Sequence, residues 1–257
     1  SDPRRSGGVS ETTRVIRLAP GDTDLRKLCE ADRIAEDVMA GRVGIAEGHA
    51  QLAGLDRPAG WRGRAMQVFG FGLASAAVAG LLRLPWLDIA TAGLIGLMIG
   101  ALELASQSRP RLQEAGDAIS GLIAGFIAIA VASFVGPLNL NTVVIAALIV
   151  LLPGMSLTNA VNELTSRHLV SGTARFAGAL TTILKLTIGT AIAFKCAEVV
   201  GLHPQIRGLR PQPDWVEAIA VLSGAFAFAV LFRAHRRDYW LVVLSAAGGY
   251  LISRFGG

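Results

Sequence analysis

Long runs of apolar residues dominate the chain after residue 64. Most of them contain about 15 to 20 residues, the length that an α-helix needs to cross a hydrocarbon layer about 30 Å thick. Inside lipid the backbone polar groups must be satisfied within the segment, so such runs fold as helices. Only 17% of the 257 residues are charged, whereas about a quarter are charged in a soluble domain. The sequence therefore predicts an all-α polytopic membrane protein.

Charged residues, Pro and Gly separate these runs and give about seven predicted transmembrane helices. Gly96 with Gly100, and Gly121 with Gly125, form pairs of small residues four positions apart. Such pairs allow helices to approach closely in lipid, so we expect tight helix contacts at both. The predicted spans are 65–82, 87–105, 118–135, 138–152, 173–199, 215–232 and 239–253.

The fourth predicted span is interrupted at Pro153 and Gly154. Proline removes a backbone donor and clashes with the preceding turn, so a helix that arrives here stops or kinks. Many transporters build a solute site from an interrupted membrane helix. We interpret Pro153-Gly154 as a helix break or gate within a segment that crosses the whole membrane.

Beyond the break, polar residues alternate with apolar ones at helical spacing over 156–168. A helix N-terminus that points into the break would attract a substrate carboxylate, and amide side chains would complete the hydrogen bonds. The alternative is an amphipathic connector whose polar face is solvated. The candidate substrate-binding residues in this stretch are Thr158, Asn159, Asn162 and Glu163.

Lys185 lies about twelve residues into the predicted fifth span. A cation at mid-membrane costs about 2.5 to 3.5 kcal/mol on insertion scales, so it should face a partner or a wet cavity. Thr181 precedes it by one helical turn on the same face, and we predict that both bind substrate. The alternative is a structural ion pair between Lys185 and Glu103 or Glu163.

Two further side chains are candidates for proton coupling. Glu103 lies near one end of the second predicted span, and His168 follows the polar stretch. A histidine titrates close to neutral pH, which suits a proton relay. The alternatives are that Glu103 simply reaches water at the membrane surface and that His168 is an ordinary surface residue. The other histidines form no cluster with metal-ligand spacing, so we expect no metal site.

The Lys and Arg residues of the connections are distributed unequally between the two sides of the predicted bundle. Ten lie on the side of the N-terminus and three on the other, which makes the N-terminal side cytoplasmic. Membrane topology thus explains the net charge of +5 better than nucleic-acid binding does. The ten are Arg57, Arg62, Arg64, Arg109, Arg111, Arg167, Arg175, Arg233, Arg236 and Arg237.

Residues 1–64 form a predicted cytoplasmic head of α+β type. Residues 12–18 have the composition of a strand, 24–40 and 45–55 have helical periodicity, and Asp22 or Thr23 would cap the first helix. One strand and two helices are too little for an independent core, so the head should dock on the membrane part or belong to a larger domain. The remaining predicted domains are a five-span transporter module, 65–200, and the start of a second membrane module, 201–257.

Enzyme signatures are absent from the sequence. It contains no H-E-x-x-H, no G-x-S-x-G, no Walker A loop and no dinucleotide-binding glycine motif at a strand-helix turn. We therefore expect no enzymatic activity and no cofactor. Any transport should be secondary, driven by an ion gradient or a solute gradient.

The segment LLPGMSLTNAVNELTSRHLVSGTARFAGALTTILKLTIGTA resembles the central signature of the threonine/serine exporter family. The resemblance covers about residues 12–200 and implies export of small amino acids across the bacterial inner membrane, driven by the proton-motive force or by antiport. Both ends look truncated against the family's span order, so the resemblance implies either a fragment of a longer protein or a chain that needs a second membrane subunit to supply further spans. The residues that carry the signature are Pro153, Gly154, Thr158, Asn159, Ser171, Gly172 and Arg175.

Two other functions stay open at this point. The first is a dicarboxylate exporter subunit, in which Lys185 and Arg175 would each hold one carboxylate of a succinate-type solute. The second is a membrane scaffold subunit that transports nothing itself. All three hypotheses place the chain in a lipid bilayer, and the two transport hypotheses differ in the solute.

Overall fold

The structure is a computed structural model that describes residues 24–55, 60–206, 208, 212–235 and 237–255. All regular elements among these residues are helices, and the only strand-like pairing there is an isolated bridge between Leu138 and Ile206. The predicted strand 12–18 lies outside the described residues. The described part of the head is therefore purely helical, and its assignment as α+β has no support there.

Helices α1 (Leu25–Met39) and α2 (Ile45–Gly54) form the head, close to their predicted bounds. They pack through Ile34, which is 2% exposed, and through Gly48, where a Cβ would lie 2.5 Å from a methyl group of Val38. The cap of α1 is Asp24 rather than the predicted Asp22 or Thr23, because its carboxylate accepts a hydrogen bond from the Lys27 amide at 3.0 Å. The capping residue sets the start of the helix.

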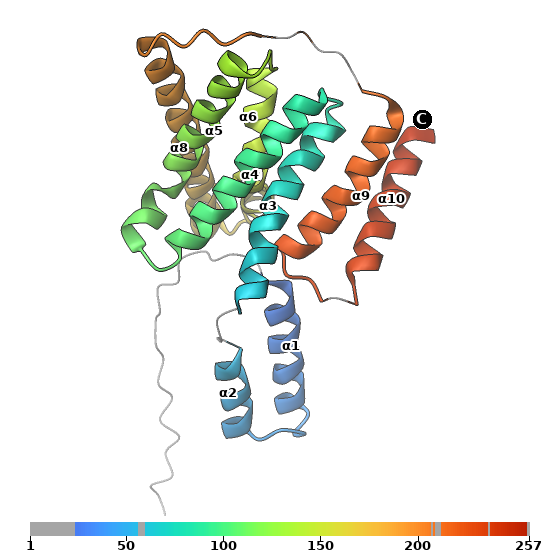
Figure 1. The fold of residues 1–257 in the computed structure, drawn as a ribbon. Coiled ribbons are helices and arrows are strands. Elements are labelled where there is room, and N and C mark those ends of the chain that lie inside the picture. The colour runs from blue at the N-terminus through green and yellow to red at the C-terminus, as the bar shows by residue number, and fades with distance from the viewer. Residues whose placement is uncertain (1–23, 56–59, 207, 209–211, 236, 256–257) are drawn as a thin grey trace, which may run out of the picture.

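The remaining helices form one bundle (Figure 1). Within the part of the chain that the structure describes, five helices are long and apolar enough to cross a membrane, which gives six crossings if the bent pair α6–α7 counts as one. Seven spans were predicted. The difference lies in the bent pair and in α10, an apolar helix of 17 residues that measures about 25 Å, at the lower limit for a crossing. The helices are α3 (Trp61–Leu81), α4 (Trp86–Ser106), α5 (Pro110–Phe134), α6 (Leu140–Leu148), α7 (Gly154–Thr165), α8 (Leu169–Val199), α9 (Asp214–Leu231) and α10 (Tyr239–Phe255).

The helices lie side by side in the order α8, α5, α4, α3, α9 and α10, and α6 packs against α3, α4 and α5. The start of α3, the α4–α5 connection and the α9–α10 connection lie on the side of α1 and α2, which we call the head side (Figure 1). The core is built mainly from Ala, Gly, Val and Ile, whose small or branched side chains let the helix axes approach. Central members are Ile95, Ile99, Ala124, Ala128, Val143 and Ala147.

The fourth apolar segment is broken where the sequence predicts. Helix α6 passes into a short 3-10 helix, η1 (Ile149–Leu151), and α7 then leaves at an angle of 64°. Together α6 and η1 measure about 18 Å, which is less than the hydrocarbon thickness. The predicted crossing of the membrane by this segment stays a prediction, because the bent pair can be one broken span or a re-entrant loop.

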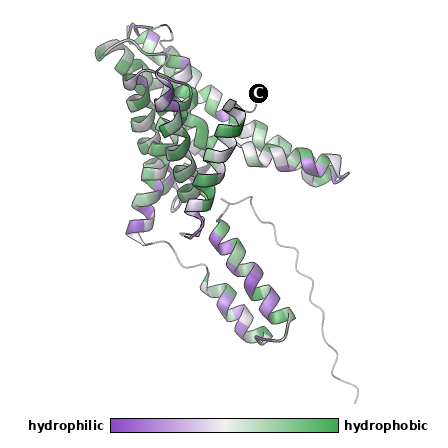
Figure 2. Cartoon of the chain, turned by 90° about the vertical axis from the view of Figure 1, so that its right-hand side faces the viewer, coloured by the Kyte–Doolittle hydropathy of each residue, from purple (hydrophilic) through white to green (hydrophobic). Residues whose placement is uncertain are grey.

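Helix α7 packs almost entirely against the first half of α8, and these two helices extend to the side of the bundle (Figure 2). Gly172 permits the contact, since a Cβ there would lie 2.8 Å from the Leu164 side chain. The second half of α8 packs against α5. There a Cβ on Gly121 would lie 2.3 Å from the Leu186 carbonyl oxygen, which confirms the predicted close approach at Gly121 and Gly125.

Candidate functional site

A cavity of about 150 Å³ lies on the head side of the bundle, directly at the helix break. Helix α3 contributes Gln67, α4 contributes Glu103, and η1 contributes Val150 and Leu151 just before Pro153. The end of α9 and the cap of α1 close it. Its lining consists of Asp24, Gln67, Phe71, Glu103, Val150, Leu151, Phe228, Leu231, Phe232 and Arg233.

Arg233 joins the walls of this cavity. It follows the C-terminus of α9 with φ +50°, a left-handed conformation that ends the helix and turns the side chain back toward α3. One guanidinium nitrogen lies 3.1 Å from Asp24 Oδ2 and the other lies 3.1 Å from Gln67 Oε1. The Leu25 amide also donates to the Phe232 carbonyl at 3.0 Å. The head is thus hydrogen-bonded to the bundle at the mouth of the cavity.

The cavity combines a carboxylate from Glu103, the amide of Gln67 and the guanidinium of Arg233 with apolar walls. Its volume corresponds to about five water molecules, which is room for a small hydrophilic solute but not for a large one. Convergent polar groups in an otherwise apolar pocket are typical of a small-molecule site. On the side of the break, the cavity is lined by Val150 and Leu151 of the 3-10 helix η1.

Of the predicted site residues, Glu103 lines the cavity with η1, which ends two residues before Pro153. Pro153, Gly154 and Lys185 do not line it. Lys185 Nζ donates to the Glu114 carbonyl at 3.0 Å and lies 3.7 Å from Asp117 Oδ2, in the second and third turns of α5. Its partner is therefore neither Glu103 nor Glu163. Lys185 also lies nearer the head side than expected, because α8 begins at Leu169 and runs beside α7 before it reaches α5.

The predicted ligands on α7 and α8 lie outside this cavity. The Thr158 hydroxyl donates to the Gly154 carbonyl at 3.0 Å, and the Thr181 hydroxyl donates to the Ala177 carbonyl at 2.9 Å. Asn159 and Asn162 are exposed on the α7–α8 projection. Their role in substrate binding stays a prediction.

Glu163 has the most constrained side chain of α7. One oxygen accepts from Arg175 Nε at 3.0 Å, whereas Oε2 is buried and accepts no hydrogen bond from a described residue. His168 is exposed and precedes α8, and only its backbone amide reaches Glu163, through the carbonyl at 2.9 Å. A proton relay between these two side chains stays a prediction.

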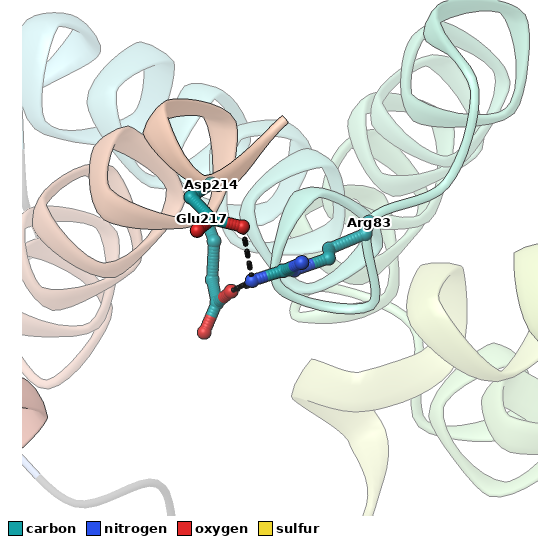
Figure 3. A network of polar contacts seen from close by, with 3 residues as sticks. All are labelled: Arg83, Asp214 and Glu217. Carbon is teal, nitrogen blue, oxygen red and sulfur yellow. Dashed lines mark hydrogen bonds and ion pairs between the residues drawn. The ribbon is translucent and has the colours of Figure 1, made fainter. Parts of the chain in front are cut away.

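Sequence reasoning missed an ion-pair network at the end of the bundle away from the head (Figure 3). Arg83, in the α3–α4 connection, binds Glu217 through Nε at 2.7 Å and Asp214 through Nη2 at 2.7 Å. The hydrogen bond to Glu217 is the main cause that raises the pKa of Arg83 above its ordinary value. The signal was available: Arg83 is a lone cation between two spans, and both acids open the sixth predicted span.

A second missed residue is Asp88, which is fully buried in the first turn of α4. Its Oδ2 accepts from the Asn139 amide at 3.1 Å and so caps the start of α6. A carboxylate that begins an apolar run looks like an interfacial residue in sequence, and its burial depends on the fold. No group of three or more metal-ligating side chains gathers within the described ranges.

A comparison with protein families matches residues 6–197 to the family described as "Putative threonine/serine exporter" (ThrE). The match covers most of the chain and includes the break, the cavity residues of α3, α4 and η1, and nearly all of α8. The chain belongs to this family. The threonine/serine exporter resemblance of the sequence is thereby confirmed, and with the apolar helices it makes the chain a multi-pass membrane protein. No curated protein and no solved structure matches the chain.

Proposed function

We propose that this ThrE-family chain is a secondary transporter that exports small hydrophilic amino acids, threonine or serine, from the cytoplasm. The observation that carries the proposal is the cavity at the helix break, with Glu103, Gln67 and Arg233 in its walls. An α-amino acid presents an ammonium, a carboxylate and a small polar side chain. The carboxylate, guanidinium and amide of the cavity match these three groups in charge and hydrogen bonding.

Glu103 is the proposed proton-coupling group of this transporter. It is half-buried in α4, in a cavity whose other walls are largely apolar. An ionisable residue within a membrane span is rare and marks a solute or proton path by default. The head side is the proposed cytoplasmic side, because most arginines of the described connections lie there.

The dicarboxylate alternative loses support from the positions of its two cations. Arg175 and Lys185 are ten residues apart on α8, about 15 Å along the helix axis, beyond the reach of a four-carbon dicarboxylate. Each also has its own carboxylate partner, Glu163 for Arg175 and Asp117 for Lys185. The favoured solute therefore remains a small amino acid.

The test is threonine efflux from proteoliposomes that contain only this chain, with and without an imposed pH gradient. We expect the gradient to accelerate threonine efflux for the unmodified chain and to have no effect on efflux for Glu103→Gln. This substitution keeps the shape of the side chain, but the amide cannot bind and release a proton. Glu114→Gln is the matched control, since the Glu114 side chain is exposed on the same side of the bundle.

Equal stimulation of Glu103→Gln and Glu114→Gln by the gradient would remove Glu103 from the coupling mechanism. Absence of efflux from the unmodified chain, with efflux restored by a second membrane subunit, would instead support the scaffold alternative. Competition of labelled threonine efflux by succinate would favour the dicarboxylate alternative despite the spacing of the two cations.

A further inference from the structure

A groove of about 880 Å³ lies on the head side, between α1, the start of α3 and the α9–α10 connection. It is separate from most of the cavity at the break, with which it shares Gln67 and Arg233. Four basic residues line it: Arg26, Arg62, Arg233 and His235. None of the described residues that line it is acidic.

The positive charge of this groove is only partly neutralised. Arg233 is paired with Asp24, but Arg26 and Arg62 form no ion pair with any described residue. The Arg62 guanidinium lies over the Trp61 ring, 5.5 Å from its centroid, and this contact leaves its charge in place. The first turn of α3 adds amide donors beside Arg62, because its cap, Gly60, has no side chain. The groove therefore favours an anion with several acceptor oxygens.

The position of the groove favours a lipid as the anionic ligand. It lies where α3 begins, α9 ends and α10 begins, at the transition from the apolar bundle to the hydrophilic head (Figure 2). Met66, Val230 and Tyr239 form an apolar wall on the side of the bundle. The Tyr239 ring packs edge-to-face on Phe226, with centroids 5.7 Å apart. Trp61, which precedes Arg62 at the start of α3, is 75% exposed. Tyr and Trp at such a level are typical of the membrane–water interface.

We propose that this groove binds the phosphate headgroup of an anionic phospholipid. Arg26 and Arg62 contact the phosphate oxygens, and the wall of Met66, Val230 and Tyr239 receives the first part of an acyl chain. Basic pockets between membrane helices bind anionic headgroups in this way, whereas a free phosphate would gain nothing from the apolar wall. The site does not depend on the identity of the transported solute.

The experiment is native mass spectrometry of the detergent-solubilised full chain, titrated with phosphatidylglycerol and, separately, with phosphatidylcholine. The test variant is Arg26→Gln with Arg62→Gln. Each arginine near a phosphate contributes roughly a fivefold change in affinity, so we expect phosphatidylglycerol binding to weaken roughly 30-fold. Arg26→Lys with Arg62→Lys, which keeps both charges, should retain most of the affinity.

The matched control is Arg109→Gln with Arg111→Gln, which removes two exposed arginines at the start of α5 on the same side. This control should leave the affinity for phosphatidylglycerol unchanged. An equal loss of phosphatidylglycerol affinity in both Gln double variants would overturn the proposal, because it would show that binding depends on the overall surface charge and not on this groove. Equal affinity for phosphatidylcholine, or displacement of phosphatidylglycerol by millimolar inorganic phosphate, would overturn the assignment to an anionic lipid.

Discussion

Ser75 makes the interrupted fourth segment compatible with its apolar surroundings. Its hydroxyl donates to the Ala147 carbonyl at 3.0 Å, and its side chain is fully buried. Ala147 lies in the last turn of α6, where carbonyls lose their intrahelical partners. Gly96 leaves the room for this contact, since a Cβ there would lie 2.5 Å from Ser75 Oγ. A small polar residue on α3 and a glycine on α4 thus accommodate the end of α6 before the break at Pro153.

Ser75→Ala should destabilise the bundle by about 1 kcal/mol, because it leaves a buried carbonyl without a donor. The measurement is thermal unfolding of the purified chain in detergent. Ser223→Ala is the control, since the Ser223 hydroxyl donates only to Ala220 within its own helix. A smaller loss of stability for Ser75→Ala than for Ser223→Ala would contradict the role given to Ser75.

At the scale of elements, α5 and α8 are held together by backbone contact rather than by large side chains. A Cβ on Gly189 would lie 2.0 Å from the Ala118 carbonyl oxygen. Thr190 adds a hydrogen bond to the Gly121 carbonyl at 3.3 Å, and Lys185 adds its bonds to the start of α5. Since α8 otherwise contacts mainly α7, this glycine interface is what attaches α8 to the bundle.

Gly189→Ala should therefore weaken the chain by about 1 to 3 kcal/mol, because the backbone oxygen opposite cannot move aside as a flexible side chain would. Gly178→Ala on the same helix is the matched control, as a Cβ there meets nothing within 4 Å. Thermal unfolding compares the two variants. Equal stability of both would show that α8 adjusts its position without loss.

The elements themselves could largely be predicted from the sequence, and their ends and relative positions could not. Periodicity and the break at Pro153 placed most helices within a few residues. The start of α5 was expected at Ala118 rather than Pro110, because a polar first turn outside lipid has the same hydropathy as a connection. The pairing of Lys185 with Asp117 and the sideways direction of α7 depend on contacts between residues that are distant in the sequence. The periodicity of a single sequence predicts helices but not which helices pack together.

At the scale of the whole molecule, two arginines tie α9 to the rest of the chain at opposite ends. Arg83 binds Asp214 and Glu217 at the start of α9, and Arg233 binds Asp24 of the head at its end. Both arginines have positive φ, 53° and 50°, directly after a helix. The head is consequently joined to the end of α9 through Asp24 and Arg233, and Arg233 also contacts α3 through Gln67.

Asp24 gives a prediction at this scale, because it both caps α1 and pairs with Arg233. Asp24→Asn keeps an acceptor for the cap and removes the charge, whereas Asp24→Ala removes both. Loss of the cap alone should cost about 1 kcal/mol, or roughly a fivefold faster exchange of α1 amides. We expect the α1 amides to exchange fastest in Asp24→Ala, at an intermediate rate in Asp24→Asn and slowest in the unmodified chain. An unchanged exchange rate in Asp24→Ala would show that neither the cap nor the ion pair with Arg233 stabilises α1.

The short length of α6 and η1 has an electrical consequence. Filled with water, the cavity beside η1 would bring the potential of the head-side solution partway into the membrane, and the voltage would then fall across the remaining thickness, about 18 Å of α6 and η1. A full elementary charge that crosses the membrane at 100 mV changes in free energy by about 2.3 kcal/mol. If Glu103 is the coupling group proposed above, a proton released from it into the head-side solution would move through little of this field. Under that proposal, the voltage would act mainly on the movement of charge along α6 between the cavity and the far side.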